Sequence, residues 1–259
     1  MRCASRSVDL SEFWLSEAQF ERLRPLLPDK VRGVARVDDR RVISGIIHVV
    51  KSGGRWVDAP ACYGPRKTLY NRFVRWAAKG VWQELFVTLA AAGGPPAEVL
   101  IDSTHMKAHR SAGGGKGGAR PQAIGISRGG RNSKLHALTD GEGRPLRFLL
   151  TGGQVADCRA ADVLLDDLAP RTIVLADKAY DSNAIRDLIE RQGAVPNIPS
   201  KTNRRWKSCF SKTLYKGRNA VERMFCRLKD YRRIATRYDK LATNFLSAIY
   251  LAAAVTWWL

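Results

Sequence analysis

The sequence predicts an α/β domain preceded by a small all-helical domain, and three observations support this prediction. In the first part of the chain, apolar residues recur at helical intervals. The run at residues 91–97, Ala-Ala-Gly-Gly-Pro-Pro-Ala, is rich in small residues and helix breakers. After this run, short apolar stretches typical of buried strands alternate with helical stretches. We therefore expect a helical domain at residues 1–92 and an α/β domain at residues 97–259.

Three helices are expected in the first domain. One follows Ser16, a second opens at Asp38 or Asp39, and a third follows Pro65. A basic amphipathic helix after a short turn is typical of the recognition helix of a helix-turn-helix unit, although a solvated face on an ordinary helical bundle gives the same pattern. The basic residues of the third helix that we expect to contact DNA are Arg66, Lys67, Arg72 and Arg75.

The second domain has a clear order of elements. Strands are expected at residues 99–102, 134–139, 146–150, 172–177 and 195–198, and helices at about 160–168 and 183–192. A further helix carries Glu222, so the order is strand, strand, strand, helix, strand, helix, strand, helix. The apolar C-terminal run, residues 245–259, is shorter than the roughly 20 residues of a membrane-spanning helix. We expect it to form a buried closing helix.

The charge of the chain is extreme. Its 44 Lys and Arg residues against 24 Asp and Glu residues give a net charge of +20 and a pI of about 10.3. Such an excess predicts a polyanionic partner, with nucleic acid first and an anionic membrane surface a distant alternative, because the basic residues do not line one amphipathic helix. The glycine-rich stretch from Lys107 to Lys134 contains no acid and is expected to meet a phosphate backbone, with Lys116 and Arg131 among its cations.

Several other classes of protein are disfavoured. The Gly-Gly-Gly-Lys-Gly-Gly run around Lys116 is not a nucleotide-binding P-loop, because no Ser or Thr follows the lysine. The five cysteines are far apart and form no C-x-x-C pair, which disfavours a zinc site and a disulfide framework. The N-terminus has no signal-peptide pattern. We therefore expect a cytoplasmic, nucleoid-associated protein with reduced thiols.

Three carboxylates stand out as candidate metal ligands. Two apolar strands each end in an aspartate, Asp102 and Asp177, and ligands of open α/β sheets bind beyond such strand ends. Glu222 lies in a region, Lys201 to Arg237, that holds thirteen Lys or Arg residues and only one other acid. Three acids without His or Cys favour Mg²⁺ or Mn²⁺, and two such ions can clamp a phosphodiester during phosphoryl transfer.

Each acid also has an ordinary structural interpretation. Asn219 and Glu222 fit a capping box at the start of a helix. Asp102 is compatible with a turn, and Asp177 with an ion pair to Lys178. Two other acids, Asp157 and Asp162, are alternative ligands, although both resemble helix-start residues.

A resemblance to a known family supports the metal-site interpretation. The spacing Tyr215-x2-Arg218-x3-Glu222-x6-Lys229 resembles the signature of bacterial insertion-sequence transposases with a DDE site. The runs Val-Leu-Ile-Asp102-Ser-Thr and Val-Leu-Ala-Asp177-Lys-Ala-Tyr-Asp are similar to the two aspartate motifs of that family, in the same order. The likeness covers residues 99–238, and the helical N-terminal part resembles the DNA-binding region of these enzymes.

The resemblance implies an RNase H-like catalytic domain, with a mixed central sheet flanked by helices, preceded by a small all-α, helix-turn-helix-like domain. It implies that Asp102, Asp177 and Glu222 bind the metal ions and catalyse the reaction. It also implies that Tyr215, Arg218 and Lys229 contact DNA near the cleavage site. The segment between Asp177 and Glu222 is too short for a large inserted domain.

We therefore predict a DNA transposase that binds the terminal inverted repeats of its own element on double-stranded DNA and acts as a homo-oligomer. Metal-dependent hydrolysis frees a 3′-hydroxyl at the element's end, and that hydroxyl then attacks target DNA. Two alternatives remain open, a nuclease or resolvase of the same fold and a non-catalytic DNA-binding derivative. No membrane partner is expected.

Overall fold

The computed structural model describes residues 12–29, 36–115, 117–119 and 121–259. The contacts divide the chain into two compact units, which we call the helical unit and the sheet unit. The helical unit comprises residues 1–89, 109–116 and 228–259, and the sheet unit comprises residues 90–108 and 117–227. These groupings differ from the expected domains 1–92 and 97–259, because the C-terminal segment packs with the N-terminal helices rather than with the sheet.

Within its described residues, the helical unit contains the three expected N-terminal helices and three more. Its helices are α1 (Glu17–Leu23), α2 (Asp39–Ser52), α3 (Arg66–Ala78), most of α4 (Val81–Ala91), α9 (Arg232–Ala235) and α10 (Ala242–Ala253). The last helix continues into a π-helical turn, Ala254–Trp258, and the short strand β7 spans Thr236–Arg237. The 3-10 turns are η1 (Arg24–Leu26), η2 (Trp56–Asp58), η3 (Ala61–Tyr63) and η4 (Arg110–Ala112).

The helix starts follow their sequence signals. The Ser16 side chain accepts a hydrogen bond from the Gln19 amide, and the Gln19 side chain accepts one from the Ser16 amide, which completes a capping box. The Asp38 side chain caps α2 by accepting a hydrogen bond from the Arg41 amide. The helix ends at Gly53, whose φ of +79° is the left-handed conformation that glycine adopts without strain.

Large aromatic side chains fill the core of the helical unit. Trp82 is fully buried between Phe73 and Trp76, and Phe86 packs against Tyr250 of α10. The predicted burial of the C-terminal run is therefore confirmed. The link between α2 and α3 contains two 3-10 turns, so it is longer than the roughly three- to four-residue turn of a helix-turn-helix unit.

The sheet unit is the mixed α/β domain that the sequence predicts. Its strands are β1 (Glu98–Ala108), β2 (Gly125–Ser127), β3 (Gly130–Asp140), β4 (Pro145–Gly152), β5 (Ile173–Ala176) and β6 (Val195–Asn197). Its helices are α5 (Ala161–Leu164), α6 (Asn183–Arg191), α7 (Lys212–Tyr215) and most of α8 (Asn219–Lys229). Its 3-10 turns are η5 (Asp157–Ala160), η6 (Lys178–Tyr180) and η7 (Lys216–Arg218).

The sheet combines antiparallel and parallel pairing. Strand β1 is central, with β3 antiparallel to it on one side and β5 parallel on the other. Strand β6 continues the parallel side, whereas β2 and β4 both pair with β3 in antiparallel fashion. The expected fold class, an α/β domain with a mixed central sheet flanked by helices, is confirmed.

Strand β1 is longer than predicted. The expected strand ended at Asp102, but β1 continues to Ala108, because β3 pairs with it as far as Lys107 opposite Asn132. Asp102 therefore lies inside a strand, and the expectation that it ends one is wrong. Its neighbour β5 ends at Ala176, however, so Asp102 lies beside the point where the parallel pairing stops.

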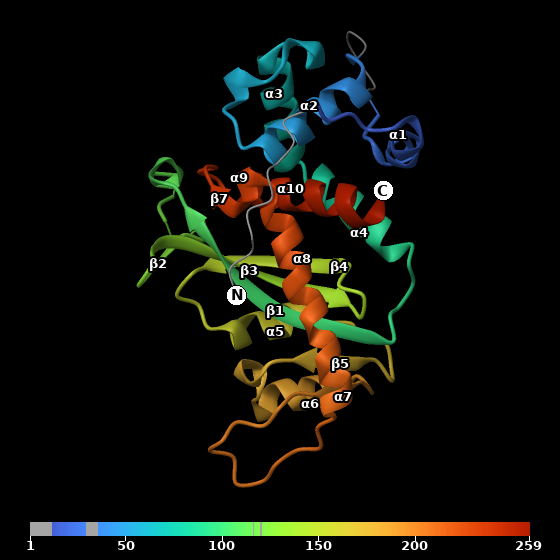
Figure 1. Ribbon diagram of the computed structural model, residues 1–259, viewed down its shortest axis with the longest axis vertical. Helices are drawn as coiled ribbons and strands as arrows, with labels where there is room; N and C mark the ends of the chain where they lie inside the picture. Colours follow the sequence, from blue (N-terminus) through green and yellow to red (C-terminus); the bar gives the residue numbers. More distant parts are fainter. Residues whose placement is uncertain (1–11, 30–35, 116, 120) are drawn as a thin grey trace. The chain divides into compact units, whose positions relative to one another are not determined.

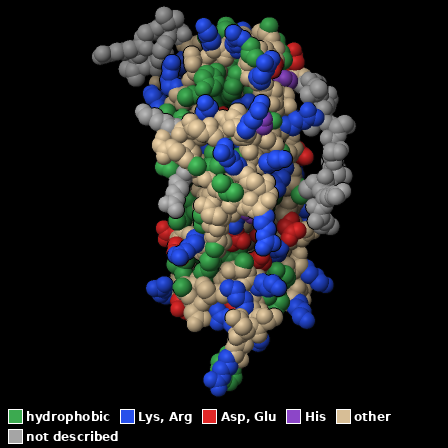
Figure 2. Space-filling view, turned by 90° about the vertical axis from the view of Figure 1, so that its left-hand side faces the viewer, with side chains coloured by type: hydrophobic (Ala, Val, Ile, Leu, Met, Phe, Trp, Pro, Cys, Tyr) green, Lys and Arg blue, Asp and Glu red, His purple; other side chains and the backbone are tan. Residues whose placement is uncertain are grey.

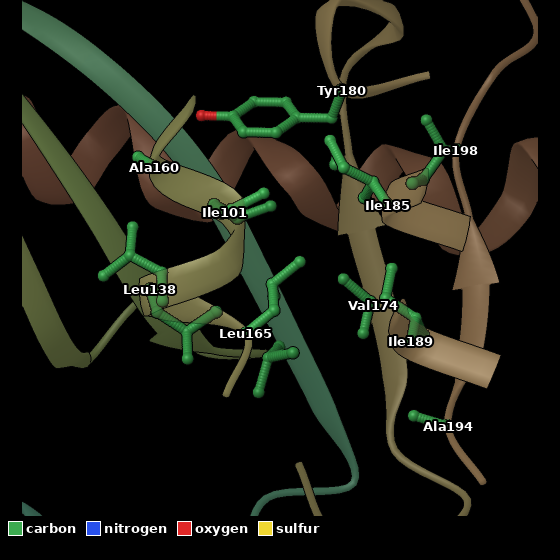
Figure 3. Close-up of a cluster of buried hydrophobic side chains, with 14 residues drawn as sticks. Ile101, Leu138, Ala160, Leu165, Val174, Tyr180, Ile185, Ile189, Ala194 and Ile198 are labelled. Carbon is green, nitrogen blue, oxygen red and sulfur yellow. The ribbon is translucent and has the colours of Figure 1, made fainter. Parts of the chain in front are cut away.

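Different helices cover the two faces of this sheet. On one face, Val99 and Ile101 of β1 and Val174 of β5 pack with α5 and α6 in one buried hydrophobic cluster (Figure 3). On the other face, α8 crosses β1 (Figure 1). Because side chains alternate along a strand, Asp102 belongs with Leu100 to the face that α8 covers.

Candidate active site

Asp102 lies on β1, and Asp177 directly follows β5, the parallel neighbour of β1. Ile101 of β1 is paired with Ala176 of β5, and the residue that follows each of them in the sequence is one of the two aspartates. Neighbouring strands are about 4.8 Å apart. Asp102 and Asp177, from distant parts of the chain, therefore each follow the last residue pair of this parallel ladder.

Both carboxylates are partly fixed by backbone hydrogen bonds. One Asp102 oxygen accepts from its neighbouring amide, Ser103 N, at 2.8 Å. Asp177 is the N-cap of η6 and accepts from Ala179 N at 2.8 Å. Burial raises the pKa of the Asp102 carboxyl, and the negative charge of Asp177 acts in the same direction, against the opposing effects of Ser103 N and Arg218.

The third acid reaches this pair through an arginine. One terminal nitrogen of Arg218 donates to Asp102 Oδ2 at 2.7 Å, and the other donates to Glu222 Oε1 at 2.6 Å. The guanidinium also lies over the Tyr215 ring, 5.7 Å from its centroid. Arg218 therefore bridges two of the three predicted metal ligands and supplies the positive charge between them.

The amphipathic pattern of α8 orients Glu222. The buried side of the helix carries Ala220, Val221, Met224, Phe225 and Leu228, while Glu222 is exposed. The helix start is held by a close approach to the β3–β4 turn, where a Cβ at Gly143 would lie 2.7 Å from the Ala220 carbonyl oxygen. Since Gly143 also has a φ of +83°, this contact requires glycine.

The acids fit a hard divalent cation in chemistry, and partly in arrangement. Among the residues that the structure describes, no three His, Cys, Asp or Glu side chains are close enough together to hold a metal ion as they stand. The guanidinium of Arg218 lies between Asp102 and Glu222 and pairs with both. A cation that replaced this guanidinium would meet carboxylate oxygens from both sides, which are the ligands that Mg²⁺ and Mn²⁺ prefer.

A second acid–base network lies next to Asp102. Asp157 accepts from Ser103 Oγ at 2.7 Å and from the ammonium of Lys134 at 2.8 Å. The ammonium also donates to the Val155 carbonyl at 2.6 Å, and the Lys134 side chain is only 9% exposed. Although burial raises the pKa of Asp157, the contacts with Lys134 and Ser103 lower it below its usual value.

This network changes how Lys134 is interpreted. The sequence places it in a basic stretch expected to contact DNA, but its ammonium is directed at Asp157 within the sheet unit. We therefore leave it out of the proposed DNA surface. Strand periodicity alone does not reveal the pair, because its two members are far apart in the sequence and both are polar.

A third network lies just beyond Asp177, where the sequence analysis assigned no role. The Asp181 carboxylate is fully buried and accepts from Arg186 at 2.9 Å, Arg204 at 2.6 Å and the Lys201 amide at 2.8 Å. Burial raises the pKa of Asp181, but these donors together lower it to about 2. The only sequence signal was its place in the run Asp177-Lys-Ala-Tyr-Asp, which ends at this residue.

These bonds tie down a projecting basic loop, residues 199–211. Within the loop, the Ser208 amide donates to Ser200 Oγ. At its base, the Asn197 side chain donates to the Ser211 carbonyl and accepts from the Ser211 amide. At its tip, Trp206 is 81% exposed between Arg205 and Lys207. Figure 2 shows Lys and Arg side chains spread widely over one face of the molecule, including this loop at the lower end.

The predicted DNA contacts differ in accessibility. Arg66, Lys67 and Arg75 are exposed on α3, whereas Arg72 pairs with Asp39 and stacks 4.8 Å from the Trp76 ring centroid. Three further predicted contacts belong to other elements: Arg131 is exposed at the start of β3, Tyr215 ends α7 and Lys229 ends α8. The predicted contact at Lys116 lies outside the described residues.

Two family models, both of transposases, match the two parts of the chain. The family model described as the transposase DDE domain matches residues 93–257, which is well over half of the chain. A second model, for transposases of the IS4/5 family, matches residues 15–86.

Individual relatives agree with these matches. A protein assigned as the transposase of insertion sequence element IS6501 from Brucella ovis is 39% identical over 126 residues, which are 48% of this chain and 97% of that protein. One assigned to element IS402 of Burkholderia cepacia is 28% identical, over 49% of this chain and 63% of the relative.

Solved structures similar to the chain are also transposases. The piggyBac transposase in a synaptic complex with hairpin DNA has a TM-score of 0.48 and 11% identity, over 95% of this chain and 72% of that one. The Mos1 transposase paired-end complex with the left transposon end has a TM-score of 0.27 and 14% identity, over 84% of this chain and 71% of that one. In the described part of the present chain, no helix has the length and apolar character needed to cross a membrane.

Proposed function

The chain belongs to the DDE transposases of bacterial insertion sequences, which are metal-dependent DNA-cleaving and DNA-joining enzymes, and we propose that Asp102, Asp177 and Glu222 form its catalytic metal site. The observation that carries this proposal is that both aspartates follow the Ile101–Ala176 pair directly, while Arg218 joins Asp102 to Glu222. Asp157 is adjacent, but its pairing with Lys134 favours a supporting role.

The proposed cofactor is a pair of Mg²⁺ or Mn²⁺ ions, held by the three carboxylates. When bound, they supply Lewis acidity at the scissile phosphate. The chain's own contribution is position and charge: β1 and β5 fix the two aspartates by their register, and α8 presents Glu222 from the facing side.

The proposed reaction has two steps. In the first, a water oxygen bonds to the phosphorus at the element's end, and the bond from phosphorus to the 3′ oxygen breaks, leaving a 3′-hydroxyl. In the second, that 3′ oxygen attacks a phosphodiester of target DNA and displaces its 3′ oxygen. Two element ends must be brought together, so we propose that the protein acts as a homo-oligomer on double-stranded DNA.

We propose two groups of cations as the DNA-binding surface. Near the site, Arg218 and Lys229 contact phosphates, with Tyr215 beside them, and Arg131 extends this surface along β3. In the helical unit, the exposed residues Arg66, Lys67 and Arg75 bind the terminal inverted repeat. The net charge of +20 supports a polyanionic partner of this kind.

The proposal is tested with the full chain and a duplex carrying the element's terminal repeat. We expect cleavage and strand transfer with Mg²⁺ by the wild-type protein. Asp102→Asn should lose both products, by at least about a hundredfold, while it retains DNA binding, because the lost carboxylate serves chemistry rather than affinity. Asp162→Asn, an exposed acid on α5, is the matched control and should behave as wild type.

The same assay separates the alternatives. Cleavage without joining would identify a nuclease or resolvase, and binding without either product would identify a non-catalytic DNA-binding protein. Equal loss of binding and cleavage in Asp102→Asn would contradict the assigned role of the acid.

A further inference from the structure

The basic loop, residues 199–211, presents an uncovered aromatic ring. Trp206 is 81% exposed, a larger fraction than any other large hydrophobic side chain in the described part of the chain. A covered tryptophan buries roughly 150–250 Å² and is among the most stabilising side chains at an interface. Single exposed apolar residues are common on protein surfaces, so a partner is indicated only if the ring is held in place and its surroundings match a ligand.

Hydrogen bonds fix the loop on both sides of this ring. Before Trp206, the Arg204 guanidinium donates to the buried Asp181 carboxylate at 2.6 Å. After it, the Lys207 ammonium donates to the Lys201 carbonyl at 2.8 Å, which closes the loop on itself. Figure 1 shows the loop extending away from α6 and α7. Because the loop is already ordered, a ligand that covers Trp206 loses little of its binding free energy to ordering the protein.

The loop carries only positive charges. Residues 199–212 contain five Lys or Arg residues and no acid. Arg205 and Lys207 flank the ring and are exposed, and the Lys207 ammonium is bonded to carbonyl oxygens that do not neutralise its charge. Proteins bind unpaired nucleic-acid strands with aromatic rings among cations, because bases stack on the rings while the cations contact phosphates. The surroundings of Trp206 therefore match unpaired DNA.

The end of the loop leads to the DNA contacts proposed near the site. The Phe210 ring packs edge-on against the Tyr215 ring, with centroids 5.2 Å apart. The Arg218 guanidinium lies 5.7 Å from the centroid of the same Tyr215 ring and donates to Asp102 at 2.7 Å. Side-chain contacts therefore connect the loop to the acids, and the loop extends the proposed DNA surface beyond Tyr215.

We propose that the loop 199–211 is a binding site for unpaired DNA bases, in which Trp206 stacks on the face of a base while Arg205 and Lys207 contact the flanking phosphates. The base comes from a free single strand or from a duplex whose pairing has opened, since both expose a base face that an intact duplex hides. The inference rests on the proposed DNA surface and is independent of the proposed metal site, because the loop contains none of the three acids.

The test measures binding of the full chain, without divalent cations, to three fluorescent probes by anisotropy. One is an oligothymidine strand, the second a duplex closed at both ends by non-nucleotide linkers, and the third the same closed duplex with an internal run of mismatched bases. Trp206→Ala should weaken binding to the strand, the mismatched duplex or both by about tenfold, and binding to the matched duplex by less than about twofold. Loss on the strand alone assigns the base to a free single strand, and loss on the mismatched duplex assigns it to opened pairing.

Matched variants separate the ring from its size and charge. Trp206→Phe keeps an aromatic face and should retain most of the affinity for unpaired bases, whereas Trp206→Leu should lose it like Trp206→Ala. Arg205→Gln should lower the salt dependence of strand binding by about 0.7 in the log–log slope, which Trp206→Ala leaves unchanged. Val195→Ala, which truncates another exposed apolar side chain of the sheet unit, should bind all probes as wild type. All variants should melt with the wild-type protein, because these side chains are exposed.

The inference is overturned if Trp206→Ala binds both unpaired probes as wild type, if it loses equal affinity for the matched duplex, or if Trp206→Leu binds as wild type. The wild-type measurement keeps the two proposals apart. If the wild-type protein binds none of the probes, the proposed DNA surface fails, and this inference with it. If it binds them and Trp206→Ala binds them equally well, only the role of the loop fails. The effect of Trp206→Ala should persist in an Asp102→Asn background, whatever the outcome for the metal site.

Discussion

Arg218 controls the charge balance of the site at the scale of single residues. Asp102 is half-buried next to Asp177, and two neighbouring carboxylates repel each other unless a cation lies between them. The Arg218 guanidinium offsets this repulsion from the Asp102 side, since it donates to Asp102 at 2.7 Å and to Glu222 at 2.6 Å. The same group is a strong ligand for phosphate. We therefore expect Arg218 to exchange its carboxylate partners for DNA when metal ions bind.

Arg218→Gln tests this exchange. Without DNA, the variant should melt at a lower temperature than wild type, because Asp102 loses its cation, yet it should bind Mn²⁺ about tenfold more tightly, because its competitor is gone. Arg223→Gln, an exposed arginine on α8, is the control for the change in net charge. Mn²⁺ affinity in Arg218→Gln no higher than in Arg223→Gln would show that the guanidinium does not compete for the site.

At the scale of elements, the site depends on turns that follow the strands. The turn η6 leads from Asp177 to Asp181, whose buried carboxylate holds α6 through Arg186 and the basic loop 199–211 through Arg204. Breaking a buried pair leaves an uncompensated charge and destabilises a protein by about 3 kcal/mol or more. The loop that carries Trp206 therefore depends on this acid for the position of its first half, at Lys201 and Arg204.

The Asp181 network also predicts a pH dependence. The folded pKa of about 2 lies below the ordinary aspartate value of about 4, so the stabilisation is complete above pH 4 and is lost as the pH falls through 2. Asp181→Asn should be about 3 kcal/mol less stable at neutral pH and should lose less stability over this window. Urea unfolding at stepped pH measures both effects. Asp187→Asn, which changes an exposed acid on α6, should keep the wild-type dependence of the unfolding free energy on pH. If Asp181→Asn also kept the wild-type dependence, the low pKa would not belong to Asp181.

Elements with strong local sequence signals were predictable. Elements that depend on pairing with distant parts of the chain were not. The caps at Ser16 and Asp38 and the stop at Gly53 fix helices through local hydrogen bonds and backbone conformation, so their sequence signatures suffice. The length of β1 was not predictable, because its second half is polar and exists through pairing with β3. The ion pair between Lys134 and Asp157 depends on the same long-range pairing.

At the scale of the whole molecule, the site joins three segments that are far apart in the sequence. Periodicity placed Asp102 and Asp177 near strand ends and Glu222 on a helix, and the family signature linked them. The sequence did not reveal that Arg218 bridges two of the acids, or that the buried Tyr180 hydroxyl has no hydrogen-bond partner in the part of the chain that the structure describes. Both features depend on side-chain directions that only the packed sheet and α8 define.

The account rests on one claim, that Asp102, Asp177 and Glu222 act together as ligands of the same divalent ions. The most direct test is Mn²⁺ titration, followed by electron paramagnetic resonance, of the wild-type protein bound to its DNA end and of Asp102→Asn, Asp177→Asn and Glu222→Gln. We predict that each substitution weakens Mn²⁺ binding by at least about tenfold, while the control Asp162→Asn binds as wild type. Wild-type Mn²⁺ affinity in any of the three variants would contradict the claim.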